Sequence, residues 1–178
     1  MSYFAAAVVR GSKGWAASDF DLTGVSDVED VADRLRDVDL EASISLLFVE
    51  IDEEYLVLLR LDDGEDLRVF GSDAAVAEES RWGAVLVADL EPPDHGIDIP
   101  DELEAADPET EEAEPVAGTP ADADAVPTGD VDILSDLGVS GQRLLAMCAT
   151  EGKLPSDVTA EVCDLLGCVD AVEELREA

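Results

Sequence analysis

The sequence predicts an α+β fold in which an antiparallel or mixed sheet packs against two helices. Three observations favour this class. Apolar runs of strand length recur through residues 1–90, short acidic or glycine-containing turns separate them, and one intervening segment has amphipathic helical spacing. Two changes in composition then divide the chain into a sheet domain at 1–90, an acidic linker at 91–128 and a small helical region at 129–178.

The first half of the sheet domain predicts two strands and one helix. Residues 3–9 are an apolar strand, and after a glycine-containing turn Trp15 begins a short second strand. The segment 26–38 carries apolar residues at i, i+3, i+4 and i+7, which form a single helical stripe. We expect Ser26 to cap this helix, with Glu29 completing a capping box.

The second half predicts a hairpin meander, a helix and a last strand. The meander consists of three apolar strands joined by short acidic turns, at residues 43–51, 55–61 and 67–70. The first of these is apolar on both alternating faces, so we expect it at the centre of the sheet. Residues 72–80 predict a helix capped by Ser72, and residues 83–90, GAVLVADL, predict the final strand.

The linker at 91–128 has the composition of a disordered segment. It contains 13 acidic residues, no basic residue and seven of the eight prolines. Such a segment cannot bury enough apolar surface to offset chain entropy, and a flexible chain of this length reaches roughly 35 Å. It serves either as a tether or as an acidic docking segment.

The last fifty residues predict four short helices, at 131–138, 141–152, 155–167 and 169–178. Gly138 and Gly167 are candidate C-caps, and Ser140 is a candidate N-cap. Helices this short form a marginal core. Three arrangements are open: this region docks on the sheet domain, pairs with itself or grips a partner helix.

The charge excludes several classes of function. There are 45 acidic and 10 basic residues, a net charge of −35. Binding the phosphate backbone of a nucleic acid requires Lys and Arg to displace counterions, and anionic membrane surfaces are disfavoured for the same reason. A basic protein partner or simple solubility fits better. No run of 18 apolar residues is present and no basic residue precedes the N-terminal apolar patch, so we expect a cytoplasmic protein.

No catalytic, cofactor or metal site is predicted. The three cysteines, Cys148, Cys163 and Cys168, lie in apolar helical patterns and are interpreted as buried free thiols. The only histidine, His95, lies in the linker and is interpreted as an exposed loop residue. The acidic turns DEE and DDGED lack the ligand order of a calcium loop, and RGSKG is a hairpin turn rather than a phosphate loop.

Four residues are candidate contacts for a partner. Trp15 and Trp82 follow polar turns, where they lie either at the edge of the core or at a binding surface. Ser72 and Asp73 form a corner between an apolar strand and the second predicted helix.

Several segments together resemble the actinobacterial tRNA adenosine deaminase-associated proteins. They are YFAAAVVRGSKGW, SDVEDVADRLRD, the apolar hairpin LLFVEIDEEYLVLLRLDDGEDLRVFGSDAA and the closing GDVDILSDLGVSGQRLLAMCATEGKLPSDVTAEVCDLLG. The likeness spans both regions expected to be ordered. It implies association with the zinc enzyme that converts the wobble adenosine of tRNA to inosine, and it supplies no catalytic residue. The chain lacks the His-x-Glu and Pro-Cys-x-x-Cys elements of such a deaminase.

These observations favour a non-catalytic accessory or adaptor protein that contacts a basic protein, with the deaminase as the first candidate and direct nucleic-acid binding disfavoured. The alternative is an acidic mimic of nucleic acid that inhibits a basic partner. An unrecognised small enzyme, and a soluble domain whose charge serves only solubility, are further hypotheses.

Overall fold

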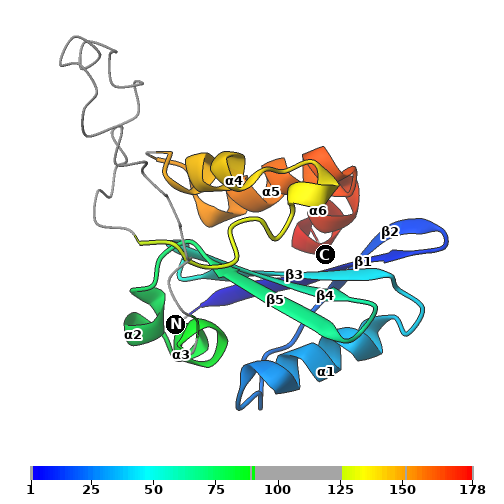
Figure 1. The fold of residues 1–178 in the computed structure, drawn as a ribbon, viewed down its shortest axis with the longest axis horizontal. Helices are drawn as coiled ribbons and strands as arrows, with labels where there is room; N and C mark the ends of the chain where they lie inside the picture. Colours follow the sequence, from blue (N-terminus) through cyan, green and yellow to red (C-terminus); the bar gives the residue numbers. More distant parts are fainter. Residues whose placement is uncertain (1, 89, 91–125, 151, 178) are drawn as a thin grey trace, which may run out of the picture.

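The computed structural model is a three-layer arrangement, with one sheet between two layers of helices (Figure 1). The structure describes residues 2–88, 90, 126–150 and 152–177. Most of the predicted linker, including His95, lies outside the described residues. The predicted α+β class is confirmed, and the antiparallel alternative for the sheet is the correct one.

Six strands form the sheet: β1 (Tyr3–Gly11), β2 (Gly14–Asp19), β3 (Ile44–Ile51), β4 (Tyr55–Asp62), β5 (Asp66–Gly71) and β6 (Thr128–Gly129). Their order is β2-β1-β3-β4-β5-β6, and every neighbouring pair is antiparallel. The five strands predicted before residue 71 are confirmed. The segment predicted to be central, β3, lies between β1 and β4, where both of its faces are covered.

Neighbouring residues of the central strands face opposite helix layers because side chains alternate along a strand. In β4, Leu58 packs toward the C-terminal helices and Leu59 toward the N-terminal ones, and both are 0% exposed. Two charged side chains interrupt this pattern, Glu50 in β3 and Arg60 in β4. Both interact with residues of the C-terminal region, so the polar interruptions fall on one face.

The predicted first helix is α1 (Val28–Val38), whose buried stripe is Val31, Ala32 and Leu35. Its predicted cap is wrong by one residue. Asp27, not Ser26, accepts the capping hydrogen bond from the backbone N of Asp30 at 2.9 Å, and the Asp30 carboxylate accepts from the backbone N of Ser26 at 3.0 Å. Asp27 and Asp30 take the place of the Ser26–Glu29 box, and both carboxylates lie at the positive end of the helix, where negative charge is favoured.

The second predicted helix begins later than expected. It is α2 (Val76–Glu79), preceded by Ala75 without a side-chain cap. Ser72 does not cap it, because its Oγ accepts a hydrogen bond at 3.0 Å from the backbone N of Leu56 in β4.

The predicted strand at 83–90 is wrong, since residues 81–87 form the helix α3 (Arg81–Val87). Val85 and Val87 favour a strand, whereas the alanines and leucines of this run favour a helix, and burial of Leu86 and Val87 against the sheet determines the outcome. The close packing of α3 on α2 requires Gly83, where an added Cβ would lie 2.0 Å from the carbonyl oxygen of Val76. The sheet edge beside β5 is taken instead by β6.

The C-terminal region forms a 3-10 turn and three helices: the turn Ser135–Leu137, α4 (Gly141–Cys148), α5 (Pro155–Leu166) and α6 (Val169–Glu177). The caps predicted at Ser140, Gly138 and Gly167 are confirmed, with Gly167 in the left-handed region at φ 82°. The first predicted helix, 131–138, is only the 3-10 turn.

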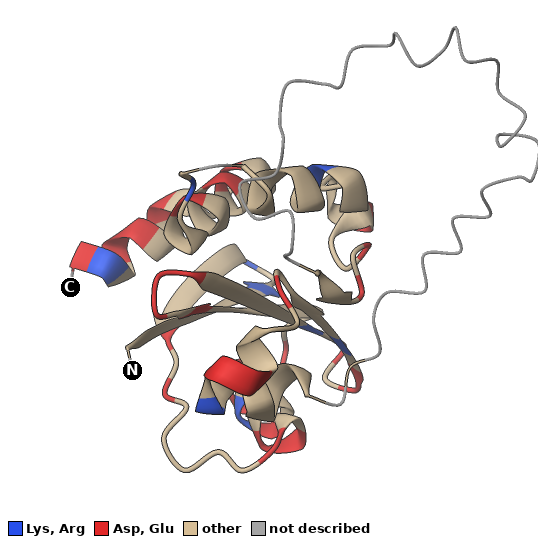
Figure 2. Ribbon diagram, turned by 90° about the vertical axis from the view of Figure 1, so that its left-hand side faces the viewer, with Lys and Arg blue, Asp and Glu red and all other residues tan. Residues whose placement is uncertain are grey.

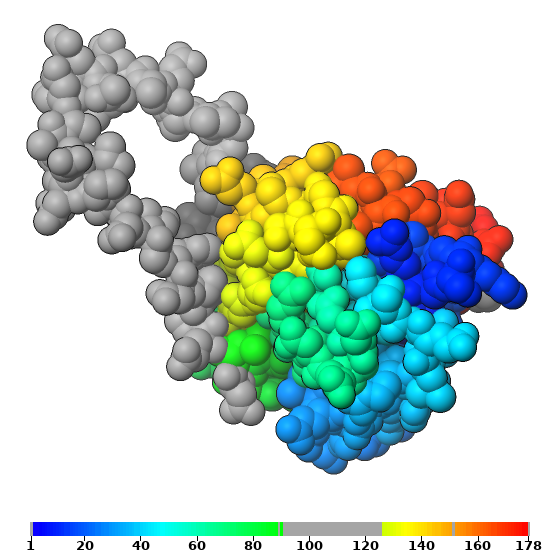
Figure 3. Space-filling model, turned by 45° about the vertical axis from the view of Figure 1, so that its right-hand side comes forward, coloured from blue at the N-terminus to red at the C-terminus, as the bar shows by residue number. Residues whose placement is uncertain are grey.

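The C-terminal helices pack on the sheet face opposite α1, α2 and α3. Their buried residues join those of the strands in one apolar cluster, which includes Phe48, Phe70, Met147 and Val162. Figure 3 shows this region, yellow to red, against the N-terminal hairpin in blue. Of the three arrangements that the sequence left open, the structure shows docking on the sheet.

Candidate protein-interaction site

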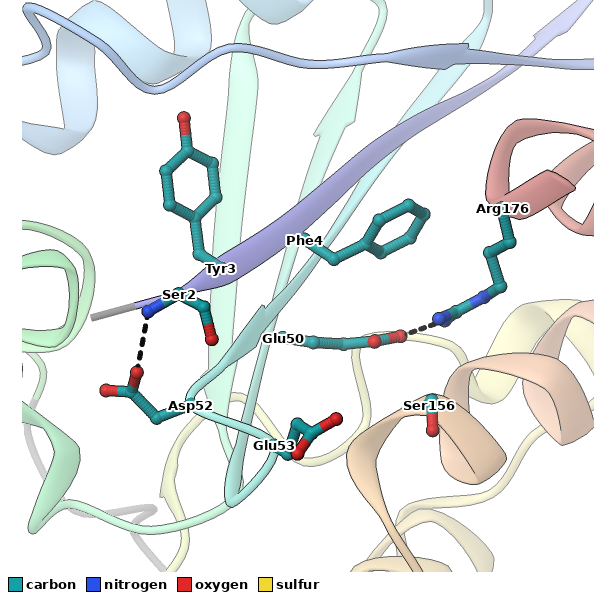
Figure 4. Close-up of a pocket in the computed structure, with 8 residues that line it drawn as sticks. All are labelled: Ser2, Tyr3, Phe4, Glu50, Asp52, Glu53, Ser156 and Arg176. Atoms are coloured by element: carbon teal, nitrogen blue, oxygen red, sulfur yellow. Dashed lines mark hydrogen bonds and ion pairs between the residues drawn. The ribbon is translucent and has the colours of Figure 1, made fainter. Parts of the chain in front are cut away.

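A recess of about 230 Å³ opens where the start of β1 meets the C-terminal helices (Figure 4). Its walls come from β1, the end of β3, the β3–β4 turn, the first turn of α5 and the end of α6. The lining residues are Ser2, Tyr3, Phe4, Glu50, Asp52, Glu53, Ser156 and Arg176. We call this the acidic recess. An adjoining recess of about 270 Å³ lies between α5 and α6 and shares Ser156 and Arg176 with it.

The β3–β4 turn fixes one wall of the acidic recess. The carboxylate of Asp52 accepts a hydrogen bond at 2.8 Å from the backbone N of Ser2, and the backbone N of Asp52 donates to the carbonyl of Ser2 at 2.9 Å. Asp52 and Glu53 both have left-handed backbone angles, with φ of 52° and 63°. The backbone of the turn is therefore tied to the start of β1, and the exposed side chain of Glu53 lies at the mouth of the recess.

The opposite wall is a buried carboxylate with one arginine. The side chain of Glu50 is 8% exposed and pairs with the guanidinium of Arg176 from the last turn of α6. The same guanidinium lies over the ring of Phe4, with its Cζ 4.3 Å from the ring centroid. A cation is thus held by a carboxylate and an aromatic face, the two groups that bind guanidinium best.

The charges of the acidic recess favour a cationic ligand. Three carboxylates, those of Glu50, Asp52 and Glu53, line it against the single cation of Arg176. Figure 2 shows acidic residues on the turns and helices of both layers, with few basic ones. Within the described part of the chain, no three His, Cys, Asp or Glu side chains are grouped to hold a metal ion. The arrangement suits recognition of Lys or Arg side chains.

The two tryptophans predicted as contacts lie on opposite sides of the sheet. Trp15, on β2, is half-buried against the C-terminal helix cluster, with the guanidinium of Arg10 5.7 Å from its ring centroid. Trp82, on α3, is half-buried against the other cluster and meets Tyr3 edge to face at 5.2 Å. The structure does not bring them into one site. Trp82 touches the Tyr3 ring, which points away from the acidic recess toward the other face of the sheet (Figure 4).

Ser72 and Asp73 form the expected corner after β5. Besides the Ser72 bond to Leu56, the Asp73 carboxylate accepts hydrogen bonds from the backbone N of Ala75 at 3.0 Å and of Val126 at 3.3 Å. These bonds connect β4, the start of α2 and the segment leading into β6. Whether the corner also contacts a partner stays a prediction.

Arg60 is a residue whose importance the sequence interpretation missed. Its side chain, 4% exposed, donates to the carbonyl of Ile133 at 2.7 Å, to Asp136 at 2.8 Å and to Asp62 at 2.8 Å. The paired Asp136 carboxylate raises the pKa of Arg60 and, reciprocally, the guanidinium lowers the pKa of Asp136. A single arginine inside the apolar strand YLVLLRL was the signal that could have revealed it.

All three cysteines are free, as predicted; Cys163 and Cys168 are buried and Cys148 is half-buried. Burial raises the pKa of the Cys148 thiol to about 12, so this thiol is protonated at neutral pH. Within the part of the chain that the structure describes, no helix is long and apolar enough to cross a membrane.

Comparison with known proteins gives a family match. The model of a family described as Rv3753c-like tRNA adenosine deaminase-associated protein matches residues 3–169, which confirms the resemblance seen in the sequence. No curated protein and no solved structure matches.

Proposed function

Because the chain belongs to the Rv3753c-like tRNA adenosine deaminase-associated protein family, we propose that it is a non-catalytic accessory protein that binds a tRNA adenosine deaminase. The observation that carries the proposal is the net charge of −35. An enzyme that acts on tRNA presents a basic face to the phosphate backbone, and an acidic protein is attracted to that face. The same charge opposes direct capture of tRNA by this chain.

The non-catalytic part of the proposal rests on sequence chemistry. A zinc deaminase of nucleobases uses His and Cys ligands, including a Cys-x-x-Cys pair, and a Glu as proton carrier. This chain has one histidine, and its three cysteines do not form a Cys-x-x-Cys pair. The enzymatic chemistry therefore belongs to the partner, and this chain contributes binding.

The acidic recess supports a contact role for the end of the sheet where β1 begins and β3 turns into β4. Two hydrogen bonds between Ser2 and Asp52, one of them to the Asp52 carboxylate, fix the backbone of this turn, so the position from which Glu53 projects is set before a partner arrives. Complementary charges held in position mainly raise the association rate and select the partner. We assign this end of the molecule as the contact with basic side chains of the deaminase.

Calorimetry with the purified deaminase tests the proposal. We expect binding at about 50 mM salt that weakens by about tenfold or more at 500 mM, because salt screens exposed charges. Glu53→Lys should weaken binding by roughly threefold to tenfold. Glu65→Lys is the matched control, since Glu65 is an exposed glutamate in the β4–β5 turn, at the other end of β4.

No detectable heat at low salt would contradict the proposed partnership. Equal losses in the two variants would attribute binding to net charge alone and contradict the assignment of the acidic recess.

A further inference from the structure

The last turn of α6 is held to the sheet mainly by one arginine. In α6 the only fully buried side chain is Val172, four residues before Arg176. Beyond Val172, Glu173, Glu174 and Glu177 are exposed. Leu175 is half-buried, and the ion pair and ring contact of this turn with the sheet come from Arg176, which reaches the Glu50 carboxylate and the Phe4 ring. The directional contact that holds the end of this helix on the sheet is therefore the ion pair of Arg176 with Glu50, and water and other cations can compete for it.

The site that receives Arg176 belongs to the sheet and does not depend on α6. Glu50 lies in β3, paired in register with Phe4 of β1, so the carboxylate and the ring are neighbours across two hydrogen-bonded strands. Both side chains point to the C-terminal helix face. Removal of Arg176 would leave an aromatic face beside a largely buried carboxylate, with Asp52 and Glu53 at the rim.

A buried carboxylate without a cation is costly, whereas exchange of one guanidinium for another conserves the ion pair and the ring contact. A partner's arginine could therefore replace Arg176 at little cost to the fold, while α6 loses only its last turn. The recess volume and its open mouth beside Glu53 provide the approach.

We propose that Phe4 and Glu50 form a binding site for an arginine side chain of a basic protein partner, and that Arg176 occupies this site in the free protein as a built-in competitor. This inference rests on the proposed binding of a basic protein, and it specifies the residues, Phe4 and Glu50, that contact an arginine of that protein. The partner's arginine displaces Arg176, and the end of α6 is released. The measured affinity for the partner is therefore lower than the affinity of an empty site, in proportion to the fraction of time that the site is free of Arg176.

The first test uses L-arginine amide as the probe and follows the backbone amides of Phe4 and Glu50 by NMR in the full chain. In Arg176→Gln we expect shifts at both residues that saturate at millimolar probe, with far smaller shifts in the wild type. Arg176→Lys, which keeps a cation, should lie between them and guards against a folding defect in the first variant. Arg143→Gln removes an arginine that is half exposed on α4 and should behave as the wild type.

Absence of shifts at Phe4 and Glu50 in folded Arg176→Gln would overturn the site, as would shifts that persist in the double variant Glu50→Gln with Arg176→Gln. Lysine amide binding as tightly as arginine amide would overturn the assignment to arginine.

The second test measures affinity for the deaminase and separates this inference from the proposed function. Arg176→Gln should bind about tenfold more tightly than the wild type, and adding Glu50→Gln should abolish the gain. Deaminase binding that is unchanged in both variants would overturn the arginine site and leave the proposed function standing. Arginine-amide binding without any deaminase binding would overturn the proposed function and leave the site standing.

Discussion

The sheet face covered by α1, α2 and α3 buries no charged side chain among the described residues, whereas the face covered by α4, α5 and α6 buries both Glu50 and Arg60. The first set of helices follows the strands directly along the chain. The second set joins the sheet from across residues 91–125. Helices that arrive over a long connection need contacts that specify where they dock, and the ion pairs of Glu50 and Arg60 are directional contacts of this kind.

The two buried charges do different work. Arg60 makes bonds to the backbone of Ile133 and to Asp136 at the start of the C-terminal region, which fixes its first turn on β4. Glu50 holds only the last turn of α6, through a half-exposed arginine. The C-terminal layer is thus anchored firmly where it begins and loosely where it ends.

Truncation of adjacent leucines in β4 is expected to have the largest effect. Leu58→Ala and Leu59→Ala should each cost about 2–5 kcal/mol of unfolding free energy, because both side chains are fully buried. Urea unfolding measures the cost, and hydrogen exchange locates it. Leu58→Ala should accelerate exchange in α4 and α5 more than in α1, and Leu59→Ala should do the reverse. Uniform acceleration in both variants would show that the two faces unfold as one unit.

Loss of Arg60, which fixes the start of the C-terminal region on β4, should have the second-largest effect on the free energy of unfolding. Arg60→Ala is expected to cost about 3 kcal/mol, because it removes a side chain that is 4% exposed, breaks its partly buried ion pairs with Asp62 and Asp136, and leaves the buried Ile133 carbonyl without its donor. Arg68→Ala is the matched control on β5, and it should cost about 1 kcal/mol or less because its side chain is 34% exposed. Thermal unfolding of the two variants gives the comparison, and similar losses would contradict the anchoring role of Arg60.

A smaller, pH-dependent effect should appear at Asp136. Its pKa in the folded protein is lowered below the ordinary value of 3.8, chiefly by hydrogen bonds from Arg60. The resulting stability is fully present above the unfolded pKa and is lost as pH falls through the folded pKa. Asp136→Asn should therefore be less stable than the wild type by about 1 kcal/mol at pH 7, with the gap closing below pH 4. A gap that is constant down to pH 2 would contradict this origin.

The sequence predicted the elements whose signal is local. The stripe of α1 and the alternating or continuous apolar runs of β1, β3 and β4 were sufficient, since burial of those residues is the same in any fold that keeps the elements. The caps at Ser140 and Gly167 were equally local. The family resemblance was also carried by the order of these segments.

The sequence did not predict α3, the Asp27 cap or the acidic recess. The run at 83–90 mixes strand-forming valines with helix-forming alanines and leucines, and its packing on α2 and the sheet decides for a helix. Glu50, Phe4 and Arg176 are scattered over the chain, and no local spacing connects them.

The amino-acid sequence by itself determined the apolar pattern of the strands, the amphipathic helices and the large negative charge, because each depends on composition and near neighbours. Only the tertiary structure decided which face each helix layer covers and which charges meet there. The physical reason is that the bonds of Arg60 to Ile133 and of Glu50 to Arg176 join residues 73 and 126 positions apart, and such bonds form only when the chain has closed around the sheet.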